Sequence, residues 1–213
     1  MKIEADKVGQ IIKENHGIIN QIIHAASDVK LPPNTIPSIN GFVGRDDYLK
    51  SLRVSYRQGT RCFVLHGIGG VGKTALALRF ASEIAEDFEA KIFVGMQGMS
   101  KNPHSARDAM LDIVRQFEPK IRADISPAEL KSIFIQFLHK QKTLVVLDNA
   151  EDKQSVEVLR EANACFITTS RKVFSLTGGK RIKILQMSPS EARRLLTEIA
   201  GKERLDGQAG RLA

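Results

Sequence analysis

A glycine-rich segment that ends in lysine and threonine is the part of the sequence best suited to chemistry. The segment GIGGVGKT runs from Gly67 to Thr74 and has the spacing of a phosphate-binding loop. Glycines let backbone N–H groups curl around phosphate oxygens, where side chains would obstruct them. The segment follows an apolar run and precedes a helical pattern, so the positive end of a helix would also face the phosphates.

Two side chains of this loop should meet the ligand directly. We expect Lys73 to reach the β- and γ-phosphates of a nucleotide and the Thr74 hydroxyl to ligate Mg²⁺. Guanine-binding proteins of this kind normally carry an Asn-Lys-x-Asp element, which this sequence lacks, so adenine is the expected base. The loop residues expected to bind ATP or ADP are Gly67, Gly69, Gly70, Val71, Gly72, Lys73, Thr74 and Ala75.

An apolar run that ends in an acid follows farther along the chain. In TLVVLDNAED, Asp148 is the expected magnesium partner of Thr74, because Mg²⁺ prefers carboxylate and other oxygen ligands. The next residue is Asn149, and an amide cannot accept a proton at neutral pH as a general base must. Asn149 can still orient a water molecule or contact the γ-phosphate, or it can be an ordinary polar turn residue. This pattern predicts slow hydrolysis.

A third apolar run, CFITTSRK, ends in hydroxyl residues and a cation. The C-terminal ends of parallel strands form the ligand crevice of an open α/β sheet. Arg171 is therefore expected near the phosphates, where it could sense the γ-phosphate through paired hydrogen bonds. A solvated arginine at a strand end is the alternative.

The elements that must position these residues alternate along the chain. The expected strands are CFVLHG, KIFVGM, TLVVLD, CFITTS and RIKILQ, and the expected helices are KTALALRFASEIAEDF, SARDAMLDIVRQF and ELKSIFIQFLHK. Strands alternating with helices predict an α/β fold with a parallel sheet covered on both faces. SPAE at 126–129 and SPSE at 188–191 each predict a capping box at a helix start.

Composition excludes some classes of protein. Hydrophobic residues make up 42% and charged residues 26% of the 213 residues, as in globular proteins. No apolar run approaches the roughly 18 residues that a membrane span needs, so we expect a cytoplasmic protein without a membrane partner. Cys62 and Cys165 lie in apolar runs and are expected to be buried and reduced. The net charge of +8 suits either a nucleic acid or a polyanionic small ligand.

Together these motifs resemble the STAND class of signalling ATPases, and more narrowly the NB-ARC-type nucleotide-binding domain. FVGRDDYLKSL at 42–52 is similar to the Val-Gly-Arg box of that family, and ILQMSPSEARRLL at 184–196 is similar to the start of its lid subdomain. The resemblance implies a P-loop fold with sheet order 5-1-4-3-2. It also implies that Val43, Gly44 and Arg45 lie at the adenine or ribose and that Arg171 is the sensor arginine.

The resemblance also implies an organisation and a function. We expect a leader and linker at 1–40, a nucleotide-binding domain at 41–187 and the start of a helical lid at 188–213, where the chain looks truncated. The expected function is an ATP/ADP switch, weakly active as a Mg²⁺-dependent ATPase, that controls effector activation through a nucleotide-dependent homo-oligomer. An AAA-type ATPase acting on DNA is the alternative, although no helix-turn-helix is recognisable and we do not expect a nucleic-acid partner. A small-molecule kinase would need an arginine-rich lid that the sequence does not show.

Overall fold

The computed structural model describes residues 32–39, 41–97, 104–160 and 164–200. A compact unit begins at Pro33. Most of the predicted leader, residues 1–31, and the end of the predicted lid, residues 201–213, lie outside the described residues. Nowhere in the described ranges is a helix both long enough and apolar enough to cross a membrane.

A five-stranded parallel sheet forms the centre of the fold, as the sequence predicts. Its order is β2-β3-β4-β1-β5, which confirms the expected order 5-1-4-3-2. The strand that carries Thr169 therefore lies between the strand before the phosphate loop and the strand of Asp148. The strands are β1 (Cys62–His66), β2 (Ala90–Gly95), β3 (Thr143–Ala150), β4 (Ala164–Ser170) and β5 (Lys180–Lys183).

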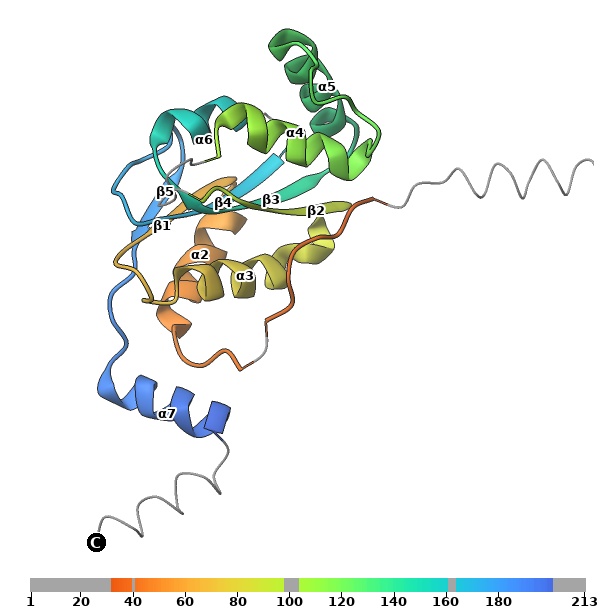
Figure 1. The fold of residues 1–213 in the computed structure, drawn as a ribbon. Helices are drawn as coiled ribbons and strands as arrows, with labels where there is room; N and C mark the ends of the chain where they lie inside the picture. Colours follow the sequence, from red (N-terminus) through yellow and green to blue (C-terminus); the bar gives the residue numbers. More distant parts are fainter. Residues whose placement is uncertain (1–31, 40, 98–103, 161–163, 201–213) are drawn as a thin grey trace, which may run out of the picture. The chain divides into compact units, whose positions relative to one another are not determined.

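Helices cover both faces of the sheet (Figure 1). α2 and α3 lie on one face, and α4, α5 and α6 lie on the other. Helix α7 follows β5 and carries the start of the predicted lid. The helices are α2 (Asp46–Arg57), α3 (Lys73–Ile84), α4 (Ala106–Phe117), α5 (Pro127–Lys140), α6 (Lys153–Leu159) and α7 (Pro189–Ala200), with a 3-10 turn at Ala85–Asp87.

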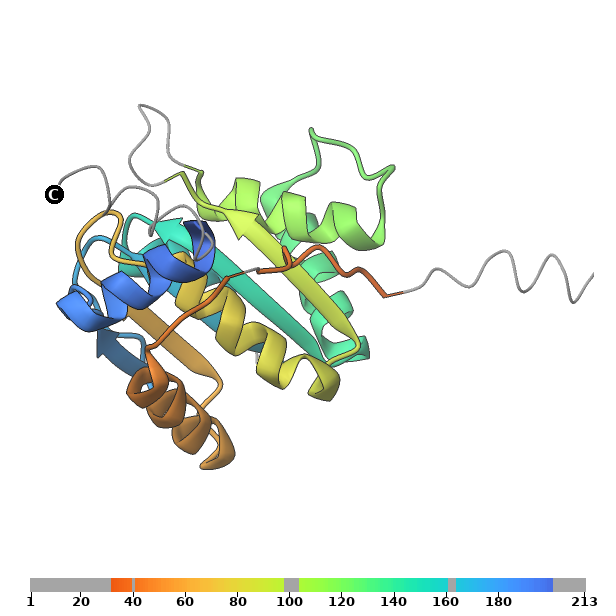
Figure 2. The same ribbon diagram turned by 90° about the horizontal axis from the view of Figure 1, so that it is seen from below.

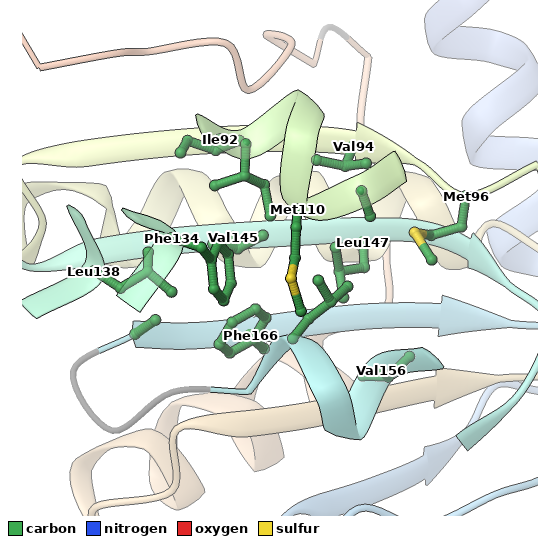
Figure 3. Close-up of a cluster of buried hydrophobic side chains, with 14 of the residues drawn as sticks. Ile92, Val94, Met96, Met110, Phe134, Leu138, Val145, Leu147, Val156 and Phe166 are labelled. Carbon is green, nitrogen blue, oxygen red and sulfur yellow. The ribbon is translucent and has the colours of Figure 1, made fainter. Parts of the chain in front are cut away.

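Alternating side chains of the central strands divide the core into two layers. On β3, Val145 and Leu147 pack with Phe134 of α5 and Met110 of α4 (Figure 3). Leu144 and Val146 of the same strand point to the opposite side of the sheet, where they face α3. The residues of β1 and β4 that point to this side face α3 as well. Burial on both faces explains why the strands read as continuous apolar runs. This burial is the main force that holds the sheet and the strand ends in place.

The two cysteines lie in different layers of the core. Cys62 of β1 belongs to the layer under α4 and α5, whereas Cys165 of β4 belongs to the layer under α3. Both are buried free thiols, as predicted. The strands are neighbours, but Cys62 is in register with Phe166, so the two sulfur atoms point to opposite faces.

The two edges of the sheet are protected in different ways. At one edge, Lys91 of β2 donates its N–H to the Pro33 carbonyl at 2.7 Å and accepts from Thr35 N at 2.8 Å, so part of the proline-rich linker runs beside β2 (Figure 2). At the other edge, β5 exposes Lys180, Arg181 and Lys183. Exposed lysines on an edge strand discourage pairing with another chain. These three cations, which contribute to the net charge of +8, thus have a structural explanation.

The helix ends differ in detail from the predictions. Helix α3 ends at Ile84, four residues before the end of the predicted pattern, because the chain tightens into the 3-10 turn. At Ser188 the full capping box forms, with Glu191 N donating to Ser188 Oγ and Ser188 N donating to Glu191 Oε2. At Ser126 only the first of these bonds is present, from Glu129 N to Ser126 Oγ.

Candidate functional site

The glycine-rich loop joins β1 to α3, which is the context that a phosphate-binding loop requires. Gly70 has φ 73° and Gly72 has φ 92°, and both lie in the left-handed region that disfavours side chains. A Cβ on either glycine would meet nothing within 4 Å, so backbone conformation rather than space explains the glycines. With Gly72 at the N-cap of α3, the unpaired N–H groups of the first turn are available to an anion.

Lys73 begins α3 and is 8% exposed. Its Nζ donates to the carbonyl of Ile68 at 2.8 Å, so the ammonium group lies across the loop. Burial lowers the pKa of Lys73, the Arg171 guanidinium lowers it further, and Asp148 opposes the shift. An anion placed between Lys73 and Arg171 would remove this repulsion, which fits a phosphate group.

Asp148 lies at the centre of a hydroxyl network. Its Oδ1 accepts hydrogen bonds from Thr74 Oγ1 at 2.7 Å and from Thr169 Oγ1 at 2.6 Å. The structure thus brings together a hydroxyl and a carboxylate that are 74 residues apart in the chain. These are oxygen donors of the kind that Mg²⁺ prefers, and Mg²⁺ usually keeps waters and phosphate oxygens as its other ligands. The residues present fit a magnesium nucleotide.

Asn149 adopts an unusual backbone conformation beside this network. Its φ is 59°, in the left-handed region that asparagine tolerates better than most residues. Its N–H donates to Thr169 Oγ1 at 2.9 Å. The register between β3 and β4 shifts between Leu147 and Ala150, at the same point of the strand. The Thr169 hydroxyl therefore fixes both Asp148 and the chain that follows it.

Two further carboxylates follow Asn149, and both have partners. Glu151 forms an ion pair with Lys172. Asp152 caps α6, accepting from Ser155 N at 2.9 Å and from Ser155 Oγ at 2.9 Å. These contacts commit the two carboxylates to structural roles, although both lie close to Asp148 in sequence.

Arg171 lies over the phosphate loop. A Cβ built on Gly69 would come within 3.3 Å of Arg171 Cζ, so the guanidinium packs directly on the loop backbone. The Arg171 side chain is exposed. The strand-end position predicted from the sequence therefore does bring this cation to the loop.

A pocket of about 510 Å³ opens beside the loop. Its lining comes from three separate parts of the chain and is mostly apolar. The lining residues are Ile39, Gly41, Phe42, Val43, Arg45, Gly70, Val71, Gly72, Ala75, Gln186, Met187 and Leu195. A mostly apolar pocket next to a phosphate loop is suited to a base and sugar.

Val43, Gly44 and Arg45, the residues predicted to bind the base, differ in burial and in the contacts they make at this pocket. Val43 is buried in its wall. Arg45 is 6% exposed, and its guanidinium donates to Leu185 O at 2.7 Å and to Val71 O at 3.0 Å. Arg45 also lies over the ring of Tyr48, with Cζ 5.5 Å from the centroid. Gly44 lies against Glu191 of α7.

Two residues of the site have no role assigned from the sequence. Thr169 stands in the quoted run CFITTSRK, but the pattern does not show which of Thr168 and Thr169 faces Asp148. Glu191 was predicted only as a helix cap, yet its Oε1 also accepts from Arg45 N at 3.3 Å. Alternation along the strand indicates that only one of the two threonines can face Asp148, but the pairing of β3 with β4 decides which one. The Glu191 contact likewise depends on the tertiary structure.

Comparisons with known proteins identify relatives of this chain. A family model described as "AAA domain" matches residues 56–196. The regulatory protein AfsR of Streptomyces griseus is 28% identical over 187 residues, which cover 83% of this chain and 19% of AfsR. The disease resistance RPP13-like protein 2 of Arabidopsis thaliana is 26% identical over 130 residues, covering 55% of this chain and 15% of that protein.

The match to these relatives is partial in length. The chain spans about a fifth of the curated relatives it matches. Among solved structures, a Walker-type ATPase of Pyrococcus abyssi matches with a TM-score of 0.47 and 12% identity, covering 79% of this chain and 60% of that one. The relatives confirm the resemblance to NB-ARC-type domains. The chain belongs to the AAA domain family and is a P-loop NTPase domain related to AfsR and to plant disease-resistance proteins.

Proposed function

We propose that the chain is the ATP/ADP-binding switch of a STAND-type signalling protein and that it hydrolyses ATP slowly. In this proposal the loop 67–75 holds the phosphates, with Lys73 at the β- and γ-phosphates. Thr74 and Asp148 hold Mg²⁺, and Arg171 senses the γ-phosphate. Val43, Gly44 and Arg45 line the base and ribose pocket, and Asn149 positions water.

The single observation that carries slow hydrolysis is the surroundings of Asn149. An amide occupies the position directly after Asp148, and an amide cannot serve as a general base. The next two carboxylates are held by Lys172 and Ser155. A positioned general base contributes about 10²- to 10⁴-fold in rate, so an amide in place of a base after Asp148 should leave bound ATP long-lived.

A long-lived nucleotide suits a switch. A ligand at a thousand times its dissociation constant stabilises the state that binds it by about 4 kcal/mol, enough to shift a two-state equilibrium strongly. AfsR is called a regulatory protein, and the Arabidopsis relatives are named for disease resistance, which supports a signalling role. In the whole cytoplasmic protein, exchange of ADP for ATP would control homo-oligomer assembly and effector activation.

Identifying the nucleotide carried by the purified chain tests this proposal. The protein is purified without added nucleotide and denatured, and the released nucleotide is separated and identified. We expect ADP. Guanine nucleotide would contradict the base assignment, and an empty site would count against a latent switch. Rapid, sustained ATP turnover by the same preparation would rule out the switch.

A further inference from the structure

The carboxylate of Glu191 has two functions at once. It completes the capping box of α7, because Oε2 accepts from Ser188 N at 2.9 Å and from Ser188 Oγ at 2.9 Å. Its other oxygen, Oε1, accepts from the backbone N–H of Arg45 at 3.3 Å. A helix cap needs only the bonds from Ser188. The bond from the Arg45 N–H ties the start of α7 to the box Phe42–Arg45.

The side chain of Arg45 completes the connection. Its two terminal nitrogens reach the carbonyl of Leu185, just before α7, and the carbonyl of Val71, inside the phosphate loop. Hydrogen bonds from a charged donor contribute more than neutral ones, and burial at 6% exposure strengthens them. The guanidinium is thus held by the backbone on both sides of the pocket.

The backbone of the Val-Gly-Arg box is shaped for this contact. Gly44 has φ 69° and Arg45 has φ 64°, so two consecutive residues are left-handed. A Cβ on Gly44 would come within 2.9 Å of Glu191 Oε1, closer than such a contact allows. The glycine permits the approach of the carboxylate. The left-handed turn also presents the Arg45 N–H to Glu191.

These contacts join the three segments that line the pocket of about 510 Å³. The box contributes Val43 and Arg45, the loop contributes Gly70 to Gly72, and the approach to α7 contributes Gln186 and Met187. We propose that Glu191 and Arg45 form a clamp, acting as positioning residues that hold α7 over the pocket and set how slowly the nucleotide dissociates. This inference rests on the proposed function, because the pocket is assigned there to the base and ribose.

The clamp predicts a kinetic effect that a simple helix cap does not. If the pocket must open for the nucleotide to leave, weakening the clamp raises the population of the open state and therefore the dissociation rate. The phosphate contacts remain, so association should change little. Two of the five N–H donors of the Arg45 guanidinium are engaged by the carbonyls of Leu185 and Val71, which directs this side chain to the backbone on either side of the pocket.

The chain contains a matched control for this test. Glu129 occupies the same place in SPAE as Glu191 does in SPSE, at the start of α5, and it lies outside the pocket lining. Glu191→Gln and Glu129→Gln therefore make the same chemical change at the same position of two helices with a serine N-cap, although only the Glu191 side chain also accepts from its N-cap N–H. Circular dichroism and thermal unfolding of both variants establish that they are folded.

Dissociation of a fluorescent ADP analogue, chased with excess ADP in a stopped-flow instrument, measures the effect in the purified chain. We expect Glu191→Gln to raise the dissociation rate about 10-fold, the effect of losing a charge-assisted hydrogen bond of about 1.4 kcal/mol. Glu129→Gln should match the wild-type rate. Arg45→Lys, which keeps the charge but loses the two-carbonyl contact, should also speed release. Equal release rates for Glu191→Gln and Glu129→Gln would overturn the clamp.

Amide hydrogen exchange at Arg45, measured without nucleotide, tests the clamp separately from the proposed function. Glu191→Gln should accelerate exchange of the Arg45 amide, and Glu129→Gln should not. Faster exchange combined with no nucleotide binding by the wild type would overturn the proposed function while keeping the structural clamp. Unchanged exchange with normal ADP binding would overturn the clamp alone.

Discussion

Thr74 Oγ1 and Asp148 Oδ1 lie 2.7 Å apart, joining the start of α3 to the end of β3. One residue follows a glycine-rich loop and the other ends a buried strand, so only the parallel sheet brings them together. A hydroxyl and a carboxylate at this spacing can share a magnesium ion that also contacts phosphate oxygens.

Thr74→Val should make the affinity for nucleotide independent of magnesium. The substitution removes the hydroxyl ligand while keeping the size and β-branching of the side chain. We expect ADP affinity in the presence of Mg²⁺ to fall to the value measured in excess EDTA. Isothermal titration with and without Mg²⁺ measures both. A variant that still gains affinity from Mg²⁺ as the wild type does would show that Thr74 is not a ligand.

Thr169→Val and Thr168→Val form a second test, on adjacent residues of β4. Thr169 Oγ1 bonds Asp148 and receives the Asn149 N–H, so its loss should weaken magnesium-dependent ADP binding and lower the free energy of unfolding by about 1–3 kcal/mol. Thr168 Oγ1 is buried without a hydrogen-bond partner. Removing it should leave binding unchanged and raise the free energy of unfolding by up to about 1 kcal/mol. Urea unfolding and ADP titration of both variants measure these effects.

Asn149→Asp should accelerate hydrolysis. The substitution supplies a carboxylate at the position where an amide cannot accept a proton, and aspartate also tolerates the φ of 59°. We expect a rise of about 10²-fold in the single-turnover rate, the lower end of what a general base contributes. Asn149→Gly is the control, because it relieves the backbone strain without adding a base. Equal rates for the two variants would mean that the missing carboxylate does not limit the reaction.

Asp152 links stability to pH through the cap of α6. The N–H of Ser155 holds the pKa of Asp152 below its ordinary value of 3.8, and burial opposes this shift. A depressed folded-state pKa gives stability that is present above pH 3.8 and lost as pH falls through the folded-state value. Asp152→Asn caps a helix nearly as well but does not titrate. The unfolding free energies of wild type and Asp152→Asn, measured from pH 7 down to strongly acidic pH, should therefore have different slopes only below about pH 5, where Asp152 begins to bind a proton in the unfolded chain.

The sequence by itself determined the type of fold and the chemistry of the phosphate site. Apolar runs ending in Asp148 and in Thr169 alternate with helical patterns. This alternation predicts a parallel sheet in which the C-terminal ends of the strands lie side by side. The phosphate-binding loop could be recognised in the sequence because its glycines and Lys73 are close together in the chain. Burial of the two cysteines could also be predicted from neighbouring residues, because each thiol lies within a continuous apolar strand.

The tertiary structure decided which side chains share a hydrogen bond. Strand pairing selects Thr169 over Thr168 as the partner of Asp148, because neighbouring residues of a strand point to opposite faces. In the structure Glu191 caps its own helix and also accepts a hydrogen bond from Arg45, which is 146 residues away in the chain. Local sequence patterns encode helices, strands and caps. Contacts between distant segments depend on how those elements pack, so they became visible only in the folded chain.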